Sequence, residues 1–146
     1  FEELGADDDY TKIELKVSHY WTRTRHTLFG VLNGGISPGD ADLPIYDQFL
    51  LGGFNSLSAF ERGELRGDNF GLVRLGYYYR LGKVLHIGGF TEAARVASLP
   101  KDVLTDPVLS ATVMLVADTT FGPLYLAYSV AEESRRELYF TFGRSF

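Results

Sequence analysis

The sequence contains no cysteine, a single tryptophan and no long apolar run. Without cysteine, a disulfide framework and a cysteine-based metal site are both excluded. No segment approaches the ~20 consecutive apolar residues that a membrane helix requires, so a helical membrane protein is excluded as well. Basic residues are in the minority, with 14 Lys and Arg against 19 Asp and Glu and a net charge of -5. We therefore expect no nucleic-acid partner, because the electrostatic attraction to phosphate is missing.

Aromatic residues and glycine are abundant instead. The chain of 146 residues contains 11 Phe, 9 Tyr and 16 Gly, a composition typical of aromatic strands joined by turns. This length suits one domain and suffices for about eight membrane strands at roughly 10 residues each, plus their connections. We therefore expect a single all-β domain over residues 1–146, an antiparallel up-and-down transmembrane β-barrel with about eight strands in this chain.

Two-residue alternation places the strands of this barrel. In the first segment, apolar Ile13, Leu15 and Val17 alternate with polar Lys12, Glu14 and Lys16, so one face is apolar and the other is polar. The expected strands are Tyr10–Trp21, His26–Gly35, Phe70–Leu81, Val84–Ala93, Val108–Asp118, Leu124–Val130 and Leu138–Phe146, with Ile45–Leu51 as a doubtful eighth. Thr22–Arg25, Gly82-Lys83 and Thr119–Pro123 are expected to be short turns. Residues 36–68 are too long for an ordinary connection and are expected to form a functional loop.

Alternation alone fits two kinds of barrel. In a soluble barrel of lipocalin type the apolar face would turn inward around a ligand, whereas in a membrane barrel it would face lipid. Aromatic residues near strand ends, charges on the opposite face, and connections that alternate between short and long favour the membrane barrel. We therefore expect the bacterial outer membrane as the location and its lipid as a partner, with the loop of residues 36–68 outside the cell. A soluble lipid carrier is the alternative.

Three motifs, in their order along the chain, resemble one family of outer-membrane barrels. The first is the segment Leu51–Phe60, which contains Gly52, Gly53, Leu57, Ser58 and Ala59 and precedes a strand. The second is the Gly122-Pro123 opening of the penultimate strand, and the third is the ending from Phe140 to Phe146 with Gly143. Together they resemble the bacterial surface antigen superfamily, the barrels of outer-membrane insertases and two-partner secretion transporters. The first motif resembles the sixth extracellular loop of that family.

The first motif departs from the family pattern. Where the family has Val-Arg-Gly-Phe or Tyr, this chain has Leu57-Ser58-Ala59-Phe60, so the arginine that pins the loop inside the barrel is absent. This variation resembles the branch fused to patatin-like phospholipases, which implies an upstream lipase passenger that the barrel anchors and helps to translocate. Family barrels have about sixteen strands, an even count as in other bacterial barrels. The resemblance thus implies the C-terminal half of a barrel, with the other half absent here or supplied by a second copy in a homodimer.

The resemblance also implies roles for particular residues. The pinning arginine of the family pairs with an acidic residue on a following strand, and Glu92 falls where that acid would lie. Because a buried charge requires a partner, we hypothesise an ion pair in the barrel lumen between Glu92 and either Arg62 or Arg66. The alternative is that all three side chains are solvated. On the last strand, Phe140, Phe142 and Phe146 are expected to be the signal that the outer-membrane assembly machinery recognises.

Catalytic chemistry has little support in the sequence. Gly35–Gly39 matches the Gly-x-Ser-x-Gly nucleophile elbow, but Pro38 follows the serine and has no backbone N–H to donate to an oxyanion. The three histidines are not at metal-ligand spacing, so no metal or other cofactor is expected. We therefore expect this chain not to be an enzyme and to have no catalytic residue of its own. The alternative is a stand-alone eight-stranded lipid-modifying enzyme of the outer membrane, for which Ser18, His19 and His26 are the nearest set.

Overall fold

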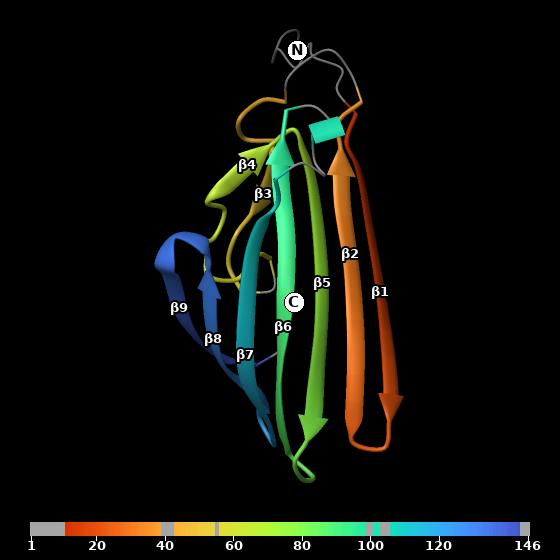
Figure 1. The fold of residues 1–146 in the computed structure, drawn as a ribbon, viewed down its shortest axis with the longest axis vertical. Helices are drawn as coiled ribbons and strands as arrows, with labels where there is room; N and C mark the ends of the chain where they lie inside the picture. Colours follow the sequence, from red (N-terminus) through yellow and green to blue (C-terminus); the bar gives the residue numbers. More distant parts are fainter. Residues whose placement is uncertain (1–10, 39–42, 55, 99–100, 103–105, 144–146) are drawn as a thin grey trace, which may run out of the picture.

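The computed structural model describes residues 11–38, 43–54, 56–98, 101–102 and 106–143, and these form an all-β fold. Seven strands make one antiparallel sheet in which each strand pairs with the next along the sheet (Figure 1). In sheet order they are β1 (Ile13–Arg23), β2 (His26–Ile36), β5 (Asn69–Arg80), β6 (Leu85–Ala97), β7 (Val108–Thr119), β8 (Gly122–Ala131) and β9 (Arg135–Phe142). The short strands β3 (Phe49–Leu51) and β4 (Leu65–Gly67) pair with each other in a second sheet. The expected all-β, antiparallel fold is thus confirmed.

Connections at the two ends of the sheet differ in length (Figure 1). At one end Thr24-Arg25 joins β1 to β2, residues 81–84 join β5 to β6, and residues 120–121 join β7 to β8. At the other end lie the connection from β2 to β5, which contains β3 and β4, the connection from β6 to β7, and a 3-10 turn at Glu132–Ser134 between β8 and β9. We call these the turn end and the loop end. No helix in the described ranges is long and apolar enough to cross a membrane.

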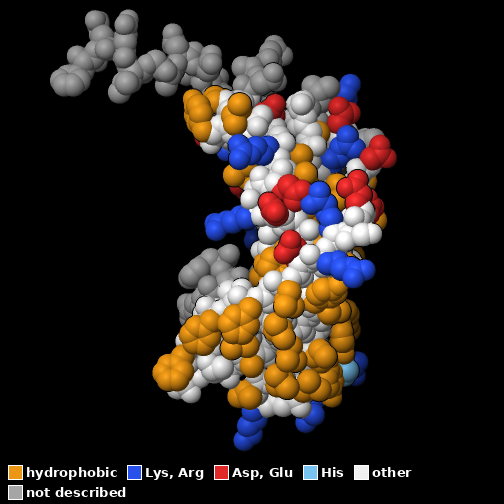
Figure 2. Space-filling model, turned by 90° about the vertical axis from the view of Figure 1, so that its left-hand side faces the viewer, with side chains coloured by type: hydrophobic (Ala, Val, Ile, Leu, Met, Phe, Trp, Pro, Cys, Tyr) orange, Lys and Arg blue, Asp and Glu red, His pale blue; other side chains and the backbone are white. Residues whose placement is uncertain are grey.

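One face of the seven-stranded sheet, here called the outer face, is apolar and exposed. Cross-strand register carries a row of such positions from strand to strand, as in Val17 beside Leu32 and Leu32 beside Val73. Its exposed large apolar side chains include Ile13, Leu15, Trp21, Leu28, Leu75, Tyr77, Ile87, Leu109, Val113, Leu115, Leu126, Tyr128, Leu138, Phe140 and Phe142. Over β8 and β9 they gather in one band, with charged side chains mostly on the loop-end side of it (Figure 2). This distribution suits a sheet that has lipid on its outer face.

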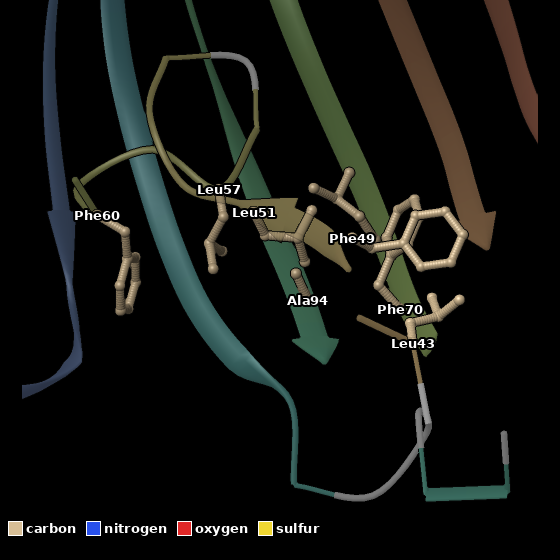
Figure 3. Close-up of a cluster of buried hydrophobic side chains, with 8 residues drawn as sticks. Leu43, Phe49, Leu51, Leu57, Phe60, Phe70 and Ala94 are labelled. Carbon is tan, nitrogen blue, oxygen red and sulfur yellow. The ribbon is translucent and has the colours of Figure 1, made fainter. Parts of the chain in front are cut away.

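The opposite, inner face is covered in part by the long loop between β2 and β5. A buried apolar cluster joins the loop to the sheet, and its members are Leu43, Phe49, Leu51, Leu57, Phe60, Phe70, Leu72 and Ala94 (Figure 3). Phe49 and Phe70, whose ring centroids are 4.9 Å apart, connect β3 to the inner face of β5. The main hydrophobic core therefore lies between loop and sheet, on the face that also holds the charged side chains.

Polar contacts fix the base of the loop. Asp68, buried just before β5, accepts hydrogen bonds from the backbone N–H of Leu43 and from the Gln48 side chain. Asn69 accepts the N–H of Ser37 at 3.1 Å and donates to the backbone carbonyls of Ala97 and Ser98 at the end of β6. These buried side chains satisfy backbone groups of the loop, as buried polar groups require. The two ends of the loop are thereby held together at the loop end of the sheet.

Four details of the sequence-based strand assignment are corrected. Ile45–Leu51 is not an eighth strand of the main sheet, because only Phe49–Leu51 is extended and it pairs with β4. Gly82-Lys83 is not a two-residue turn, since β5 ends at Arg80 and β6 begins at Leu85. β6 ends at Ala97 and not at Ala93, the expected last residue of this strand. β9 begins three residues earlier than expected, at Arg135. Tyr10 and Phe146, the expected first and last strand residues, lie outside the described residues.

Candidate functional site

The candidate site is the place where the long loop docks on the inner face. Its tip consists of Leu57, Ser58, Ala59 and Phe60, all of which are buried. Gly52 and Gly53 lie at the neck of this tip, and both have positive φ angles, at 125° and 101°. A Cβ atom on Gly52 would lie 2.0 Å from the Glu61 carbonyl oxygen, so only glycine fits at this point. The neck is closed by the N–H of Gly53, which donates to the Phe60 carbonyl at 2.9 Å.

Glu92 is the centre of the docking site. It lies on β6 directly opposite Arg74 of β5 on one side and Ser110 of β7 on the other. Arg74 Nε donates to Glu92 Oε1 at 2.9 Å, Nη2 donates to the same oxygen, and Ser110 Oγ donates to Oε2 at 3.0 Å. The Glu92 side chain is fully buried and that of Arg74 is 9% exposed. Burying two charges is tolerated only with such close pairing and additional hydrogen bonds.

The loop tip contributes its backbone to the same carboxylate. The N–H of Ser58 donates to Glu92 Oε2 at 2.6 Å, and the N–H of Leu57 donates to Oε1 at 3.3 Å. Successive backbone N–H groups in a turn form a concave site for an anion, and here that anion is a side chain of the sheet. Glu92 thus accepts five hydrogen bonds, two from Arg74, two from the loop and one from Ser110.

The loop tip adopts a strained backbone to make these contacts. Leu57 and Ala59 have φ angles of 67° and 74°, a region in which non-glycine residues are uncommon. Each such residue costs on the order of 1–3 kcal/mol, and it persists only where surrounding contacts outweigh the cost. The carboxylate of Glu92 supplies such contacts, because it accepts the N–H of Leu57 and that of Ser58, which lies between the two strained residues. Backbone strain thus coincides with the docking point, as it does at many functional sites.

A second docking point lies on β9, the last strand of the sheet. The N–H of Ala59 donates to the Tyr139 hydroxyl oxygen at 3.1 Å. The Phe54 ring packs against Tyr139 with a centroid distance of 5.3 Å, and it also contacts the rings of Phe90 and Tyr125. The loop therefore spans the inner face from β5 and β6 in the middle of the sheet to the strand at its edge.

Arg135, at the start of β9, makes a third contact with the loop. Its guanidinium lies 4.5 Å from the centre of the Phe60 ring and donates to the carboxylate of Glu64. The hydrogen bond from the N–H of Glu61 lowers the pKa of Glu64, desolvation of the carboxyl opposes this, and Arg135 lowers the pKa further. This pair is partly exposed, unlike the pair of Arg74 and Glu92. The ion pair at the centre of the sheet is thus more deeply buried than the ion pair at its edge.

A comparison with protein families identifies the domain. The family profile described as Omp85 superfamily domain matches residues 1–146. The chain belongs to the Omp85 superfamily. Its members are outer-membrane β-barrel proteins and generally have no enzymatic activity. A search of curated proteins found no match to this chain.

The ion pair of this Omp85 domain differs from the hypothesis drawn from the sequence. Glu92 is buried on the inner face, and its cationic partner there is Arg74 and not Arg62 or Arg66. Arg62 and Arg66 are exposed in the loop. The physical reason is register, because Arg74 lies directly opposite Glu92 on the neighbouring strand and needs no reach from the loop. The loop motif Gly52, Gly53 and Leu57–Phe60 does form the docking tip.

The other candidate residues from the sequence do not form a common site in the structure. Ser18 lies on the inner face of β1 and His19 on its outer face, because neighbouring strand residues point to opposite sides. His26 Nδ1 lies 2.6 Å from the Tyr77 hydroxyl at the turn end of the outer face. Ser37 is buried next to Asn69, and Gly39 lies outside the described residues. The described residues contain no cluster of three or more acidic or histidine side chains that could hold a metal.

Sequence reasoning missed Arg74, Ser110, Tyr139 and Arg135 as members of the docking site. Alternation along β5 gives the face on which Arg74 lies, but only the register between β5 and β6 sets it opposite Glu92. Tyr139 alternates with Leu138 and Phe140, and this alternation with apolar outer-face residues marks it as inward-facing. This alternation predicts the face on which Tyr139 lies, but it does not predict that the loop is its partner. Contacts between a loop and a distant strand have no local pattern in the sequence.

Proposed function

We propose that this Omp85 domain forms part of an outer-membrane barrel that anchors, and helps to translocate, an upstream patatin-like lipase. The observation that carries the proposal is the docking of the Gly52–Glu64 loop on Glu92 of a sheet whose other face is apolar and exposed. A loop that is held in a barrel lumen by a few defined contacts acts as a plug. A conformational change that breaks those contacts can move it. The expected partners are outer-membrane lipid, the assembly machinery and the passenger, with no nucleic acid.

The outer face supports insertion into lipid. Its exposed large apolar side chains would be an aggregation hazard in water, because contiguous apolar patches are rarely left uncovered on soluble proteins. In a bilayer the same side chains match the hydrocarbon, and only a closed ladder of strands satisfies the backbone there. A lipocalin-like carrier is disfavoured, because its apolar face would surround a cavity, whereas here the loop occupies the charged inner face. The stand-alone enzyme is disfavoured by the separation of Ser18, His19 and His26.

The two ends of the sheet support an orientation in the membrane. All three connections at the turn end are short, whereas two of the three at the loop end are long, and bacterial barrels have short periplasmic turns and longer external loops. β9 runs from the loop end to the turn end, so its last residues would lie on the periplasmic side. There the strand that contains Phe140 and Phe142 would be accessible to the assembly machinery. The two phenylalanines face outward and are exposed, as a recognition signal requires.

Membrane fractionation tests the barrel. The protein with an epitope inserted after Glu133, in the 3-10 turn, is expressed in a Gram-negative host and fractionated. We expect it in the outer membrane, soluble only with detergent, with altered gel mobility after heating, and with the epitope accessible from outside the cell. A protein that stays soluble without detergent would contradict the barrel and favour the carrier.

The passenger is tested by the reading frame that precedes residue 1. We expect it to encode a patatin-like lipase followed by a periplasmic module, in phase with this domain. The matching biochemical result is acyl hydrolase activity in outer-membrane fractions that is lost when the upstream serine nucleophile is replaced. A reading frame with a signal peptide placed directly before this domain would contradict the fusion, and hydrolysis by the isolated domain would favour the enzyme alternative.

A further inference from the structure

The outer face of the sheet is hollowed over β2, β5, β6 and β7. Gly30 of β2, Gly89 of β6 and Ala111 of β7 occupy outer-face positions, so no large side chain covers the backbone there. The side chains of Trp21 and Tyr77 border the hollow on the side of the turn end, and its volume is about 970 Å³. Cavities that hold small molecules have volumes of about 300–1,000 Å³. We call this hollow the outer groove, and it has room for an acyl chain.

The two glycines of the outer groove differ in what surrounds them. A Cβ atom on Gly89 would lie 2.6 Å from the Thr112 carbonyl oxygen, so a larger residue does not fit at this position. A Cβ atom on Gly30 would have the Leu75 side chain as its nearest contact, at 3.4 Å. Packing within the sheet therefore requires glycine at position 89 but not at position 30. The open space above Gly30 is available to a molecule outside the sheet.

Aromatic side chains separate the outer groove from the turn end. His26 Nδ1 lies 2.6 Å from the Tyr77 hydroxyl, and the ring of His26 packs against that of Tyr79 with a centroid distance of 5.0 Å. Trp21 precedes Arg23 by two residues of β1, a rise of roughly 7 Å along the strand. Aromatic rings of membrane barrels gather at the level of the lipid headgroups. The outer groove then lies on the hydrocarbon side of these rings, and the turn end lies on the headgroup side.

Four basic side chains, here called the basic cluster, lie at the turn end. They are Arg23, Arg25, Arg80 and Lys83, and all four are exposed. The N–H of Arg80 donates to the Arg25 carbonyl at 2.9 Å, and its guanidinium donates to the Thr24 carbonyl at 3.2 Å. These bonds hold the end of β5 beside the turn between β1 and β2. Among the described residues, none of the four basic side chains forms an ion pair.

The charge at the loop end is balanced by contrast. On the loop-end side of the apolar band acidic side chains lie among the basic ones, whereas only basic side chains are visible on its turn-end side (Figure 2). Arg135, for example, pairs with Glu64 near the loop end. Asp118, the acidic residue at the turn end of the described strands, lies on the inner face, 3.7 Å from His86. The described turn end therefore has an excess of positive charge next to the outer groove.

We propose that the outer groove and the basic cluster form a binding site for an anionic phospholipid of the membrane leaflet at the turn end. The phosphate contacts the basic cluster, the glycerol region lies at the level of Trp21 and Tyr77, and an acyl chain fills the outer groove. Clusters of Lys and Arg beside a membrane-spanning segment bind anionic headgroups in this way. A zwitterionic lipid also carries an ammonium group, which the basic cluster repels. The inference rests on the membrane insertion proposed above.

Photoreactive lipids test this site. The full-length gene product is inserted into phosphatidylcholine vesicles that contain either phosphatidylglycerol or phosphatidylethanolamine, both with the same diazirine-bearing acyl chain. After illumination, lipid-modified peptides are mapped by mass spectrometry. We expect modification at Leu28 and Val113, which line the outer groove, to be about tenfold higher with phosphatidylglycerol, because each basic side chain near the headgroup adds to its attraction. This preference should fall as salt is added, because the basic side chains are exposed and therefore screened.

Charge variants test the basic cluster. The triple variant Arg23→Gln, Arg25→Gln, Lys83→Gln keeps Arg80, whose guanidinium holds the turn. We expect its preference for phosphatidylglycerol to fall below about threefold, because most of the local positive charge is lost. The control variant removes three exposed basic side chains near the loop end, with Arg62→Gln, Arg66→Gln and Arg136→Gln. It should keep the preference of the unaltered protein.

A filled groove tests the acyl-chain site. Gly30→Val places a side chain in the outer groove and should reduce lipid modification at Val113 at least several-fold, whichever headgroup is used. Gly34→Val is the matched control, because Gly34 lies on the same face of β2, has comparable space for a Cβ atom and does not line the outer groove. Altered gel mobility after heating verifies that each variant has inserted.

Three results would overturn the inference. They are equal modification of the outer groove by the two lipids, a preference that the triple variant retains, and modification spread evenly over the outer faces of β8 and β9 as well. Each would show that the outer face is in contact with lipid without a defined site, and the proposed barrel would stand. Failure of the unaltered protein to insert into vesicles would instead overturn the proposed function, and the inference with it.

Discussion

The side chains on the two faces of the sheet have different requirements, and β7 contains examples of both. On the outer face, Val113 is 63% exposed and needs only an apolar surrounding. On the inner face, Ser110 is buried and hydrogen-bonded to one oxygen of Glu92. Outer-face residues are therefore interchangeable within a chemical class, whereas the inner-face residues around Glu92 depend on individual partners. The membrane specifies one face, and the docked loop specifies the other.

Removal of the Glu92 carboxylate should cause the largest loss in the free energy of unfolding. Glu92→Ala leaves Arg74 buried without a counter-charge and leaves the N–H groups of Leu57 and Ser58 without their acceptor. We expect a loss of about 3–5 kcal/mol in the free energy of unfolding, as for other broken buried ion pairs. Urea unfolding in lipid vesicles, followed by gel mobility without heating, measures it. Glu14→Ala, on the exposed strand β1, is the matched control, and equal losses in both variants would contradict the role of Glu92.

A charge on the outer face should have the next largest effect. Val113→Arg places a guanidinium at the middle of β7 in contact with lipid, at a cost of about 2–4 kcal/mol near the bilayer midplane. Met114→Arg places the same residue one position further along, on the inner face, and should cost much less. The same unfolding measurement compares them. If the order were reversed, the assignment of inner and outer faces would be wrong.

The edge contact of the loop should have a smaller effect. Tyr139→Phe keeps the ring that packs against Phe54 and removes the hydroxyl that accepts the Ala59 N–H. We expect a loss of about 1 kcal/mol, the usual net value of one hydrogen bond. Backbone amide exchange at Ala59 should rise in this variant, while that of Ser58, bonded to Glu92, stays slow. Equal acceleration at both amides would show that the two docking points are not separable.

Acid should weaken only the outermost contact. The pKa of Glu64 is lowered in the folded protein, chiefly by the Glu61 N–H and further by Arg135. A lowered pKa stabilises the fold above the ordinary carboxyl pKa, and this contribution disappears as the pH falls through the lowered value. Because the pair is partly exposed, we expect less than about 1 kcal/mol. Unfolding of Glu64→Gln compared with the unaltered protein between pH 7 and pH 3 measures it, and a difference that grows towards acid would contradict the sign.

The fold was largely predictable from the sequence, and the docking site only in part. Alternation such as that of Ile13, Leu15 and Val17 reports which face a side chain takes, because each strand residue reverses direction. The same alternation does not report the register between two strands, because the register depends on the length of the connection that joins them. A two-residue turn at Gly82-Lys83 would have set Arg74 opposite Thr91, whereas the longer connection sets it opposite Glu92. One residue of register decides whether the central ion pair exists.

The contacts of the loop could also be predicted only in part. Its glycines and the tip Leu57–Phe60 were recognisable as a motif, and Glu92 as its acidic target. The contacts themselves use backbone N–H groups, which every residue except proline has, so the sequence of the tip does not show how it binds. The sequence predicts that an arginine of the loop pairs with Glu92, because the family that the chain resembles docks its loop through such a side-chain pair. In this chain the strand carries the cation, and the loop contributes only its backbone at that point.

The most direct test of loop docking is the accessibility of Ser58. This side chain is fully buried, its Oγ has no hydrogen-bond partner among the described residues, and the chain has no cysteine, so Ser58→Cys adds one thiol with little disturbance. Labelling with a membrane-impermeant maleimide is measured on intact cells, with Ser134→Cys in the exposed 3-10 turn as the positive control. We predict slow labelling of Cys at position 58 when Glu92 is present and rapid labelling when Glu92→Ala is added. Equal labelling rates with and without Glu92 would contradict docking of the loop on this carboxylate.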